Sequence, residues 1–181
     1  MNLPNLLTLS RIFMIPLMVI SFYWFGKHSH LIAAALFAVA SITDWFDGYL
    51  ARKWNQTTPL GAFLDPVADK LIVAVALVLL VEHFDTQWLT IPASIMIGRE
   101  IVISALREWM AELGKRANVA VSHIGKVKTA FQMVAIVILL ASDLHSWFIT
   151  LGFISLYIAA ALTLWSMFVY LKSAWPELMA K

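Results

Sequence analysis

Four aspartates lie in one short polar stretch of an otherwise apolar chain. Asp44 and Asp47 are three residues apart, and Asp65 and Asp69 are four residues apart. Residues with these spacings share one face of an α-helix, so the carboxylates of each pair point the same way. Carboxylate oxygens are ligands of hard cations such as Mg²⁺, Mn²⁺ or Ca²⁺, and paired divalent cations assist displacement at phosphorus. The pattern therefore favours a metal site formed by all four aspartates.

The local sequence also predicts how the second pair is positioned. Thr58 followed by Pro59 is typical of an N-cap and a first helical residue, and a helix starting there aligns Gly61, Asp65 and Asp69 in one stripe. The helix before it is joined by a short break, so the two should be antiparallel neighbours whose aspartates converge. Intramembrane aspartates can also be ion-paired or carry protons, and glycines can simply be packing contacts.

The elements that must position these residues are apolar helices. The chain has 181 residues, of which 61% are hydrophobic and 13% charged, and the mean hydropathy is +0.82. We therefore expect an all-α integral membrane protein with a single domain over residues 1–181. Because there is no cysteine, any metal must be held by oxygen or imidazole, and a net charge of +2 does not suggest a nucleic-acid partner.

Six segments are long and apolar enough to cross a bilayer, which takes about 20 residues per helix. A short interfacial helix is expected before the first span, because "NLPNLLTLSR" is polar on one side and apolar on the other. The predicted spans are Leu6–Phe25, Leu31–Arg52, Leu60–Val81, Trp88–Met110, Thr129–Ala141 and Trp147–Leu171.

The distribution of basic residues predicts the orientation in the membrane. With these spans, the lysines and arginines fall at the end of the bundle that carries the N-terminus, except Lys27. Basic residues accumulate on the cytoplasmic side of membrane proteins. Both termini and the aspartates should therefore face the cytoplasm.

The stretch from Thr43 to Lys70 resembles the signature of the CDP-alcohol phosphotransferase family. That signature reads D-x-x-D-G-x-x-A-R, then eight residues, then G-x-x-x-D-x-x-x-D. "LTLSRIFMIP", "GRE" and "ALREWMAELGKRANVAVSHIGKVKT" further resemble the bacterial branch that transfers a phosphatidyl group from CDP-diacylglycerol to glycerol 3-phosphate, releasing CMP. Every signature position is met, by Asp44, Asp47, Gly48, Ala51, Arg52, Gly61, Asp65 and Asp69.

This resemblance implies six transmembrane helices in the bacterial inner membrane, two Mg²⁺ or Mn²⁺ ions and a homodimer. It assigns Asp44, Asp47 and Asp65 to the metals, and Asp69 to both a metal and the role of general base. The CDP-diacylglycerol pocket would be lined by Gly48, Ala51, Arg52, Thr58 and Gly61. Asn5 and Thr8 in the first segment are expected to reach the donor's pyrophosphate, or alternatively to anchor the segment at the lipid headgroups.

The acceptor site is predicted from basic residues. Arg99 and Arg107 are eight residues apart, so they lie on one stripe of the fourth helix. With Arg11 and with Lys126 at the start of the fifth helix, they favour an acceptor that carries a phosphate, such as glycerol 3-phosphate. Alternatively, these residues only mark the cytoplasmic side, with the arginines of the fourth helix paired to nearby glutamates. Lys128 is expected to meet anionic lipid headgroups.

Three other functions compete with this interpretation. A small transporter would also use buried charges, but it should show matching inverted halves, and we find no such repeat. A non-catalytic lipid-binding scaffold would leave the four aspartates without a role. A sister enzyme could use inositol phosphate, serine or phosphatidylglycerol as acceptor.

Overall fold

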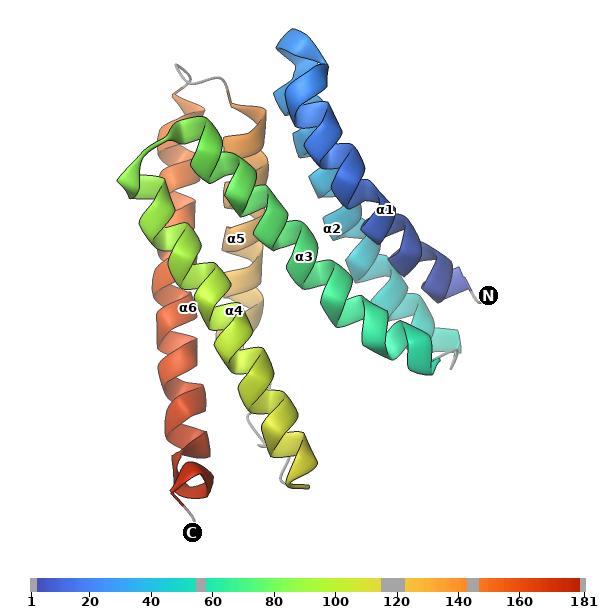
Figure 1. Ribbon diagram of the computed structural model, residues 1–181, viewed down its shortest axis with the longest axis vertical. Coiled ribbons are helices and arrows are strands. Elements are labelled where there is room, and N and C mark those ends of the chain that lie inside the picture. Colours follow the sequence, from blue (N-terminus) through green and yellow to red (C-terminus); the bar gives the residue numbers. More distant parts are fainter. Residues whose placement is uncertain (1–2, 55–57, 115–122, 143–146, 180–181) are drawn as a thin grey trace.

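Six long helices make up the described part of the chain (Figure 1). The computed structural model describes residues 3–54, 58–114, 123–142 and 147–179, without the side chains of residues 3–4, 45–54, 123–124 and 126. The helices are α1 (Leu3–Trp24), α2 (Ser29–Trp54), α3 (Pro59–Phe84), α4 (Gln87–Glu112), α5 (His123–Ala141) and α6 (Phe148–Leu178), with a 3₁₀ turn, η1 (Gly26–His28), before α2.

Each predicted span corresponds to one observed helix, but the start of the chain differs from the prediction. We expected a short interfacial helix followed by a separate span. Instead, Leu3–Trp24 is one continuous helix, so the polar residues of its first turns belong to the same helix as the first span. The expectation of a separate helix was wrong because no residue in this segment breaks the helical pattern before Pro16, and the helix continues through that proline.

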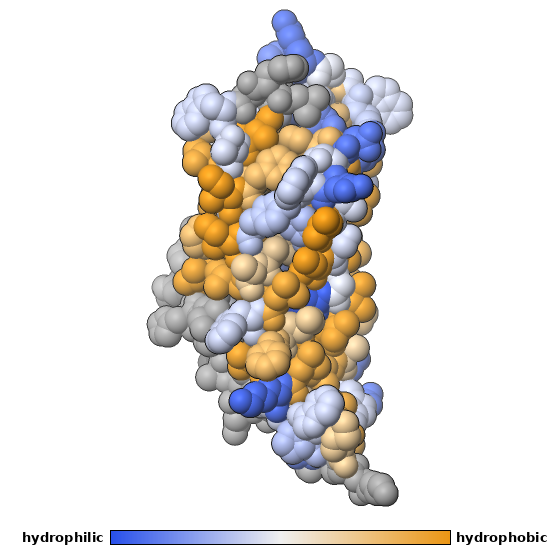
Figure 2. Space-filling model, turned by 90° about the vertical axis from the view of Figure 1, so that its left-hand side faces the viewer, coloured by the Kyte–Doolittle hydropathy of each residue, from blue (hydrophilic) through white to orange (hydrophobic). Residues whose placement is uncertain are grey.

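The surface of the bundle is that of a membrane protein. Three described helices, Asn5–Trp24, Gln87–Glu112 and Phe148–Leu178, are long and apolar enough to cross a bilayer, and Val127–Ala141 is a shorter apolar helix. Large hydrophobic side chains are exposed along them, including Phe13, Ile101 and Phe168. Hydrophobic residues cover most of the middle of the face shown in Figure 2, while hydrophilic ones gather mainly toward its two ends.

Local capping sets both ends of α3, and its start is where the sequence predicts it. The Thr58 hydroxyl accepts a hydrogen bond from the Gly61 amide at 3.1 Å, and Pro59 takes the first helical position. At the other end, Asp85 adopts the left-handed conformation with φ of 41°, and Thr86 caps the start of α4. This tight connection makes α3 and α4 consecutive neighbours.

The helices pack in an order that differs from the expected pairing of α2 with α3. Helix α1 packs against both α2 and α3, while α2 and α3 touch each other along only a short stretch. The bundle continues from α2 to α5, from α5 to α6 and from α6 to α4. Polar residues on α1 are therefore placed between the two helices that carry the aspartates.

Aromatic packing holds α1, α2 and α3 together at the end of the bundle away from the aspartates. The Phe22 ring meets the His30 ring edge-on at a centroid distance of 4.7 Å, and the His30 and His83 rings lie 4.3 Å apart. Since each residue comes from a different helix, this cluster fixes their relative positions.

We predict that Gly152→Ala destabilises the protein. A Cβ at this buried position of α6 would lie 2.7 Å from two atoms of the Leu139 side chain on α5. Leu139 is itself 0% exposed, so it cannot swing into open space, and such overpacking costs about 1–3 kcal/mol. The measurement is the apparent Tm in detergent.

Gly98→Ala on α4 is the matched control, because a Cβ there would meet nothing within 4 Å. It should leave the Tm unchanged or slightly raised. Equal loss in both variants would contradict close packing of α5 and α6 at Gly152.

Candidate active site

A single arginine of α1 joins the two helices that carry the aspartates. Arg11 is 1% exposed, and its Nη1 donates a hydrogen bond to Asp44 Oδ1 on α2. Its Nη2 lies 3.5 Å from Asp65 Oδ1 on α3. The two carboxylates are partly open to solvent, with 40% and 48% of their side chains exposed. One buried guanidinium thus draws carboxylates from two helices toward one point.

The polar stripe of α1 continues along the start of α3. Thr8, one turn before Arg11, donates a hydrogen bond to Asp65 Oδ1. One turn earlier again, Asn5 Oδ1 accepts a hydrogen bond from the Thr58 hydroxyl at 2.8 Å. The sequence analysis assigned Asn5, Thr8 and Thr58 to the same ligand, CDP-diacylglycerol. In the structure these residues lie close together, on α1 and at the start of α3.

Gly61 is needed for this close approach. It is buried, and a Cβ there would lie 2.6 Å from Asn5 Oδ1. Any larger residue would push Asn5 away from the cap of α3.

Asp69 connects the aspartate cluster to a second group of charges. It lies one turn after Asp65 on α3. It interacts electrostatically with Asp44 and Arg11, and also with Glu100 and Lys128. The carboxylate is thus within electrostatic range of two sets of charged side chains.

The second group is centred on Arg99, which is only 9% exposed. Its Nη1 donates to Glu100 Oε2 at 2.8 Å, and its Nη2 donates to Ser166 Oγ on α6 at 3.1 Å. The Nζ of Lys128 lies 3.9 Å from Glu100 Oε2. The sequence analysis allowed that Arg99 only pairs with a nearby glutamate, and Glu100 is such a partner. This pairing leaves an excess of positive charge, because the Glu100 carboxylate faces the two cations Arg99 and Lys128.

Lys128 corrects an expectation from the sequence. We expected it at the lipid headgroups, but it is buried on α5 beside Glu100. Gln132, four residues later on the same helix face, is buried as well. Two polar residues at this spacing within an apolar helix were a signal for an inward-facing polar stripe.

Arg107 on α4 also turns toward α6. Its Nη2 donates a hydrogen bond to the Tyr170 hydroxyl at 2.6 Å, and its Cζ lies 4.8 Å from the centre of the Tyr170 ring. Arg99 and Arg107 are therefore both held by α6 side chains that the sequence analysis did not identify.

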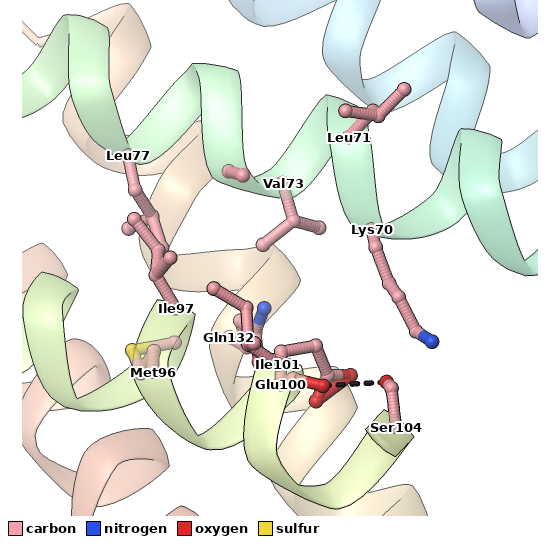
Figure 3. Close-up of a pocket in the computed structure, with 11 residues that line it drawn as sticks. Lys70, Leu71, Val73, Leu77, Met96, Ile97, Glu100, Ile101, Ser104 and Gln132 are labelled. Atoms are coloured by element: carbon pink, nitrogen blue, oxygen red, sulfur yellow. Dashed lines mark hydrogen bonds between the residues drawn. The ribbon is translucent and has the colours of Figure 1, made fainter. Parts of the chain in front are cut away.

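A cavity of about 400 Å³ opens between α3, α4 and α5 beside these charges. The cavity walls are mainly apolar, and Leu77, Met96 and Ile97 lie together in them (Figure 3). Lys70 extends from α3 toward Glu100 and Ser104 of α4 (Figure 3). The cavity can therefore take an apolar group whose polar end stays near the charged residues.

Five of the predicted site residues lie outside the described side chains. The α2 backbone is helical through Asp47, Gly48, Ala51 and Arg52, and the α5 backbone through Lys126. Their predicted roles stay predictions.

The carboxylates of Asp44, Asp65 and Asp69 have the chemistry that a divalent cation requires. Among the side chains that the structure describes, no three aspartate, glutamate or histidine residues form a ready metal-binding group. However, Asp44 and Asp65 already converge on one cation, the Arg11 guanidinium, and Asp69 is close enough to interact with Asp44. Hard oxygen donors gathered in this way fit Mg²⁺ or Mn²⁺.

Comparison with known proteins gives consistent results over nearly the whole chain. Residues 1–165 match the family described as CDP-alcohol phosphatidyltransferase. A protein of Sodalis glossinidius named CDP-diacylglycerol--glycerol-3-phosphate 3-phosphatidyltransferase is 58% identical over 180 residues, covering 98% of this chain and 97% of the relative. Proteins of the same name from Escherichia coli K12 and Yersinia enterocolitica are 57% and 55% identical, covering 98% and 99% of this chain and 97% and 98% of theirs.

We predict that Arg11→Gln makes the stability of the protein depend more strongly on divalent cations. Without the guanidinium, Asp44 loses a hydrogen bond from a charged donor and Asp65 loses an ion pair. A hydrogen bond to a charged group contributes about 1.5–3 kcal/mol. The apparent Tm should therefore fall in EDTA, and Mg²⁺ should raise it by more than in the unchanged protein, because the ion then supplies the missing positive charge.

Arg107→Gln is the control, since its partner is a tyrosine rather than a carboxylate. If Arg11→Gln and the unchanged protein gained equally from Mg²⁺, Arg11 would not be balancing the aspartates.

Proposed function

This chain belongs to the CDP-alcohol phosphatidyltransferase family, and we propose that it transfers the phosphatidyl group of CDP-diacylglycerol to glycerol 3-phosphate, releasing CMP. It is an all-α membrane enzyme, a transferase of phospholipid biosynthesis. The observation that carries the proposed reaction is the convergence of two groups of charges at one end of the bundle. Aspartates of α2 and α3 form one group, basic residues of α4 and α5 form the other, and Asp69 interacts electrostatically with members of both.

The first group suits the donor's diphosphate. Divalent ions held by Asp44, Asp47, Asp65 and Asp69 would offset the negative charge that builds on the departing CMP. Asn5, Thr8, Thr58 and Gly61 lie together on α1 and α3 beside Asp65, which supports assigning them to the donor pocket. Gly48, Ala51 and Arg52 complete that pocket in the proposal, with Arg52 binding phosphate oxygens through its planar guanidinium.

Asp69 is the proposed general base. Its carboxylate would take the proton of the acceptor's 1-hydroxyl while that oxygen attacks the phosphorus bonded to the diacylglycerol. A new P–O bond forms to the acceptor as the P–O bond to CMP breaks. Its position next to both charge groups supports this role, because the base must reach the acceptor at the donor's phosphate.

The second group suits a phosphorylated acceptor. Arg99, Arg107 and Lys126 are the proposed ligands of the glycerol 3-phosphate phosphate group. Arg11 was predicted to join them, but it is engaged by Asp44 and Asp65, so we assign it to holding the aspartates in place. Lys128 adds positive charge beside Glu100.

The proposed setting is the cytoplasmic side of the bacterial inner membrane. The start of α1 lies beside the start of α3, where Asn5 accepts a hydrogen bond from Thr58, so the donor group is at the end of the bundle where α1 begins (Figure 1). At this side, a donor anchored by its acyl chains can meet a soluble acceptor. The homodimer expected from the family resemblance stays a prediction.

The test is CMP release by the purified protein in detergent, with CDP-diacylglycerol and Mg²⁺ or Mn²⁺. We expect release with glycerol 3-phosphate and a divalent cation, and none with EDTA or without an acceptor. Preferred use of inositol phosphate, serine or phosphatidylglycerol would identify a sister enzyme instead. Absence of CMP release under every condition would favour a transporter.

Asp69→Asn should lower kcat by at least about 100-fold, because positioned general bases contribute about 10²–10⁴-fold. Binding of CDP-diacylglycerol should remain, since the other aspartates are unchanged. Asp85→Asn is the matched control at the opposite end of α3, where asparagine also tolerates the left-handed backbone. A near-normal kcat in Asp69→Asn would remove this residue from the role of base.

A further inference from the structure

Two polar side chains of α6 reach the arginines that we assign to the acceptor. Ser166 accepts a hydrogen bond from Arg99, and Tyr170 accepts one from Arg107. Ser166 and Tyr170 are four residues apart, so they lie on one face of α6 and act on the same side of α4. Neither residue belongs to the family signature recognised in the sequence.

The Ser166 contact fixes the orientation of Arg99. Ser166 is buried, and its hydroxyl donates its one proton to the Thr163 carbonyl at 2.9 Å. Its oxygen is therefore turned to accept from Arg99 Nη2 at 3.1 Å. Glu100 holds Nη1 at 2.8 Å, so the two ends of the guanidinium are tied to different partners.

Arg99 keeps unused capacity for a ligand. Its Nε is buried and has no hydrogen-bond partner among the described residues. A buried N–H without a partner is unfavourable, and a ligand oxygen would satisfy it. A guanidinium offers five N–H donors in a fixed plane, which matches the geometry of phosphate oxygens.

Tyr170 restrains Arg107 in two ways. Its hydroxyl accepts from Nη2 at 2.6 Å, and its ring centre lies 4.8 Å from Cζ. Arg107 is exposed, so without these contacts its long side chain would sample many rotamers. The hydroxyl fixes direction, while the ring adds a cation–π contact.

We propose that Ser166 and Tyr170 are positioning residues, which hold Arg99 and Arg107 in the arrangement that binds the phosphate of the acceptor. Helix α6 thereby contributes to the preference for a phosphorylated acceptor without touching it. The inference rests on the proposed function, in which the two arginines bind that phosphate.

The test compares KM for the two substrates. Ser166→Ala and Tyr170→Phe should each raise the KM for glycerol 3-phosphate by about three- to tenfold, the effect of losing one hydrogen bond of typical strength. Tyr170→Leu, which also loses the ring, should raise it further. The KM for CDP-diacylglycerol and the apparent Tm should stay within about twofold and a few degrees of the unchanged protein.

Matched controls come from contacts of the same kind elsewhere. Tyr157 on α6 donates a hydrogen bond to the Trp88 carbonyl on α4 at 3.0 Å, about 28 Å along α4 from Arg107. Ser142, the first residue after α5, donates to the Ile138 carbonyl of that helix at 2.6 Å. Tyr157→Phe and Ser142→Ala should leave the KM for both substrates unchanged.

A second measurement separates positioning from a purely structural role. In an Arg107→Ala background, Tyr170→Phe should have no further effect on the KM for glycerol 3-phosphate, because its target is gone. An equal effect in both backgrounds, or equal rises in KM for both substrates, would overturn the proposal. If the unchanged protein releases no CMP with glycerol 3-phosphate, the proposed function fails instead, which is a distinct result.

Discussion

A buried guanidinium sets the arrangement of the first three helices. Arg11 brings carboxylates of α2 and α3 toward one point on α1, where aspartates that are costly in an apolar bundle gain a counter-charge. Its position between them explains why α2 and α3 need little direct contact. Thr8 and Asn5 extend the same stripe to the start of α3, where Gly61 leaves room for them. The arrangement of α1, α2 and α3 thus follows from the need to keep these carboxylates balanced.

The second half of the site depends on the packing of α4 against α6. Arg99 and Arg107 lie on α4, but Ser166 and Tyr170 on α6 determine where their guanidiniums sit. Glu100 accepts a hydrogen bond from Arg99 and lies beside Lys128. These three side chains therefore carry one net positive charge, which a bound phosphate would balance. Asp69 interacts electrostatically with residues of both groups, which is why we propose it as the base.

Local chemistry made much of the fold predictable from sequence. The long apolar runs gave six helices, and Thr58 with Pro59 gave the start of α3, because both signals act within a few residues. The polar side of "NLPNLLTLSR" correctly indicated one polar stripe, which carries Asn5, Thr8 and Arg11. The partners of this stripe could not be predicted, because they depend on how α1 packs against both α2 and α3. Lys128, Ser166 and Tyr170 were missed for the same reason: their partners lie on helices distant in the sequence.

We propose that the aspartates and the α4 arginines form two halves of one site. The most direct measurement is the ³¹P relaxation of glycerol 3-phosphate with the protein loaded with Mn²⁺. We expect strong paramagnetic relaxation of the acceptor phosphorus, which should disappear in Arg99→Gln or when Mg²⁺ replaces Mn²⁺. Acceptor binding that shows no paramagnetic effect, or an effect unchanged by Arg99→Gln, would place the acceptor elsewhere and contradict a shared site.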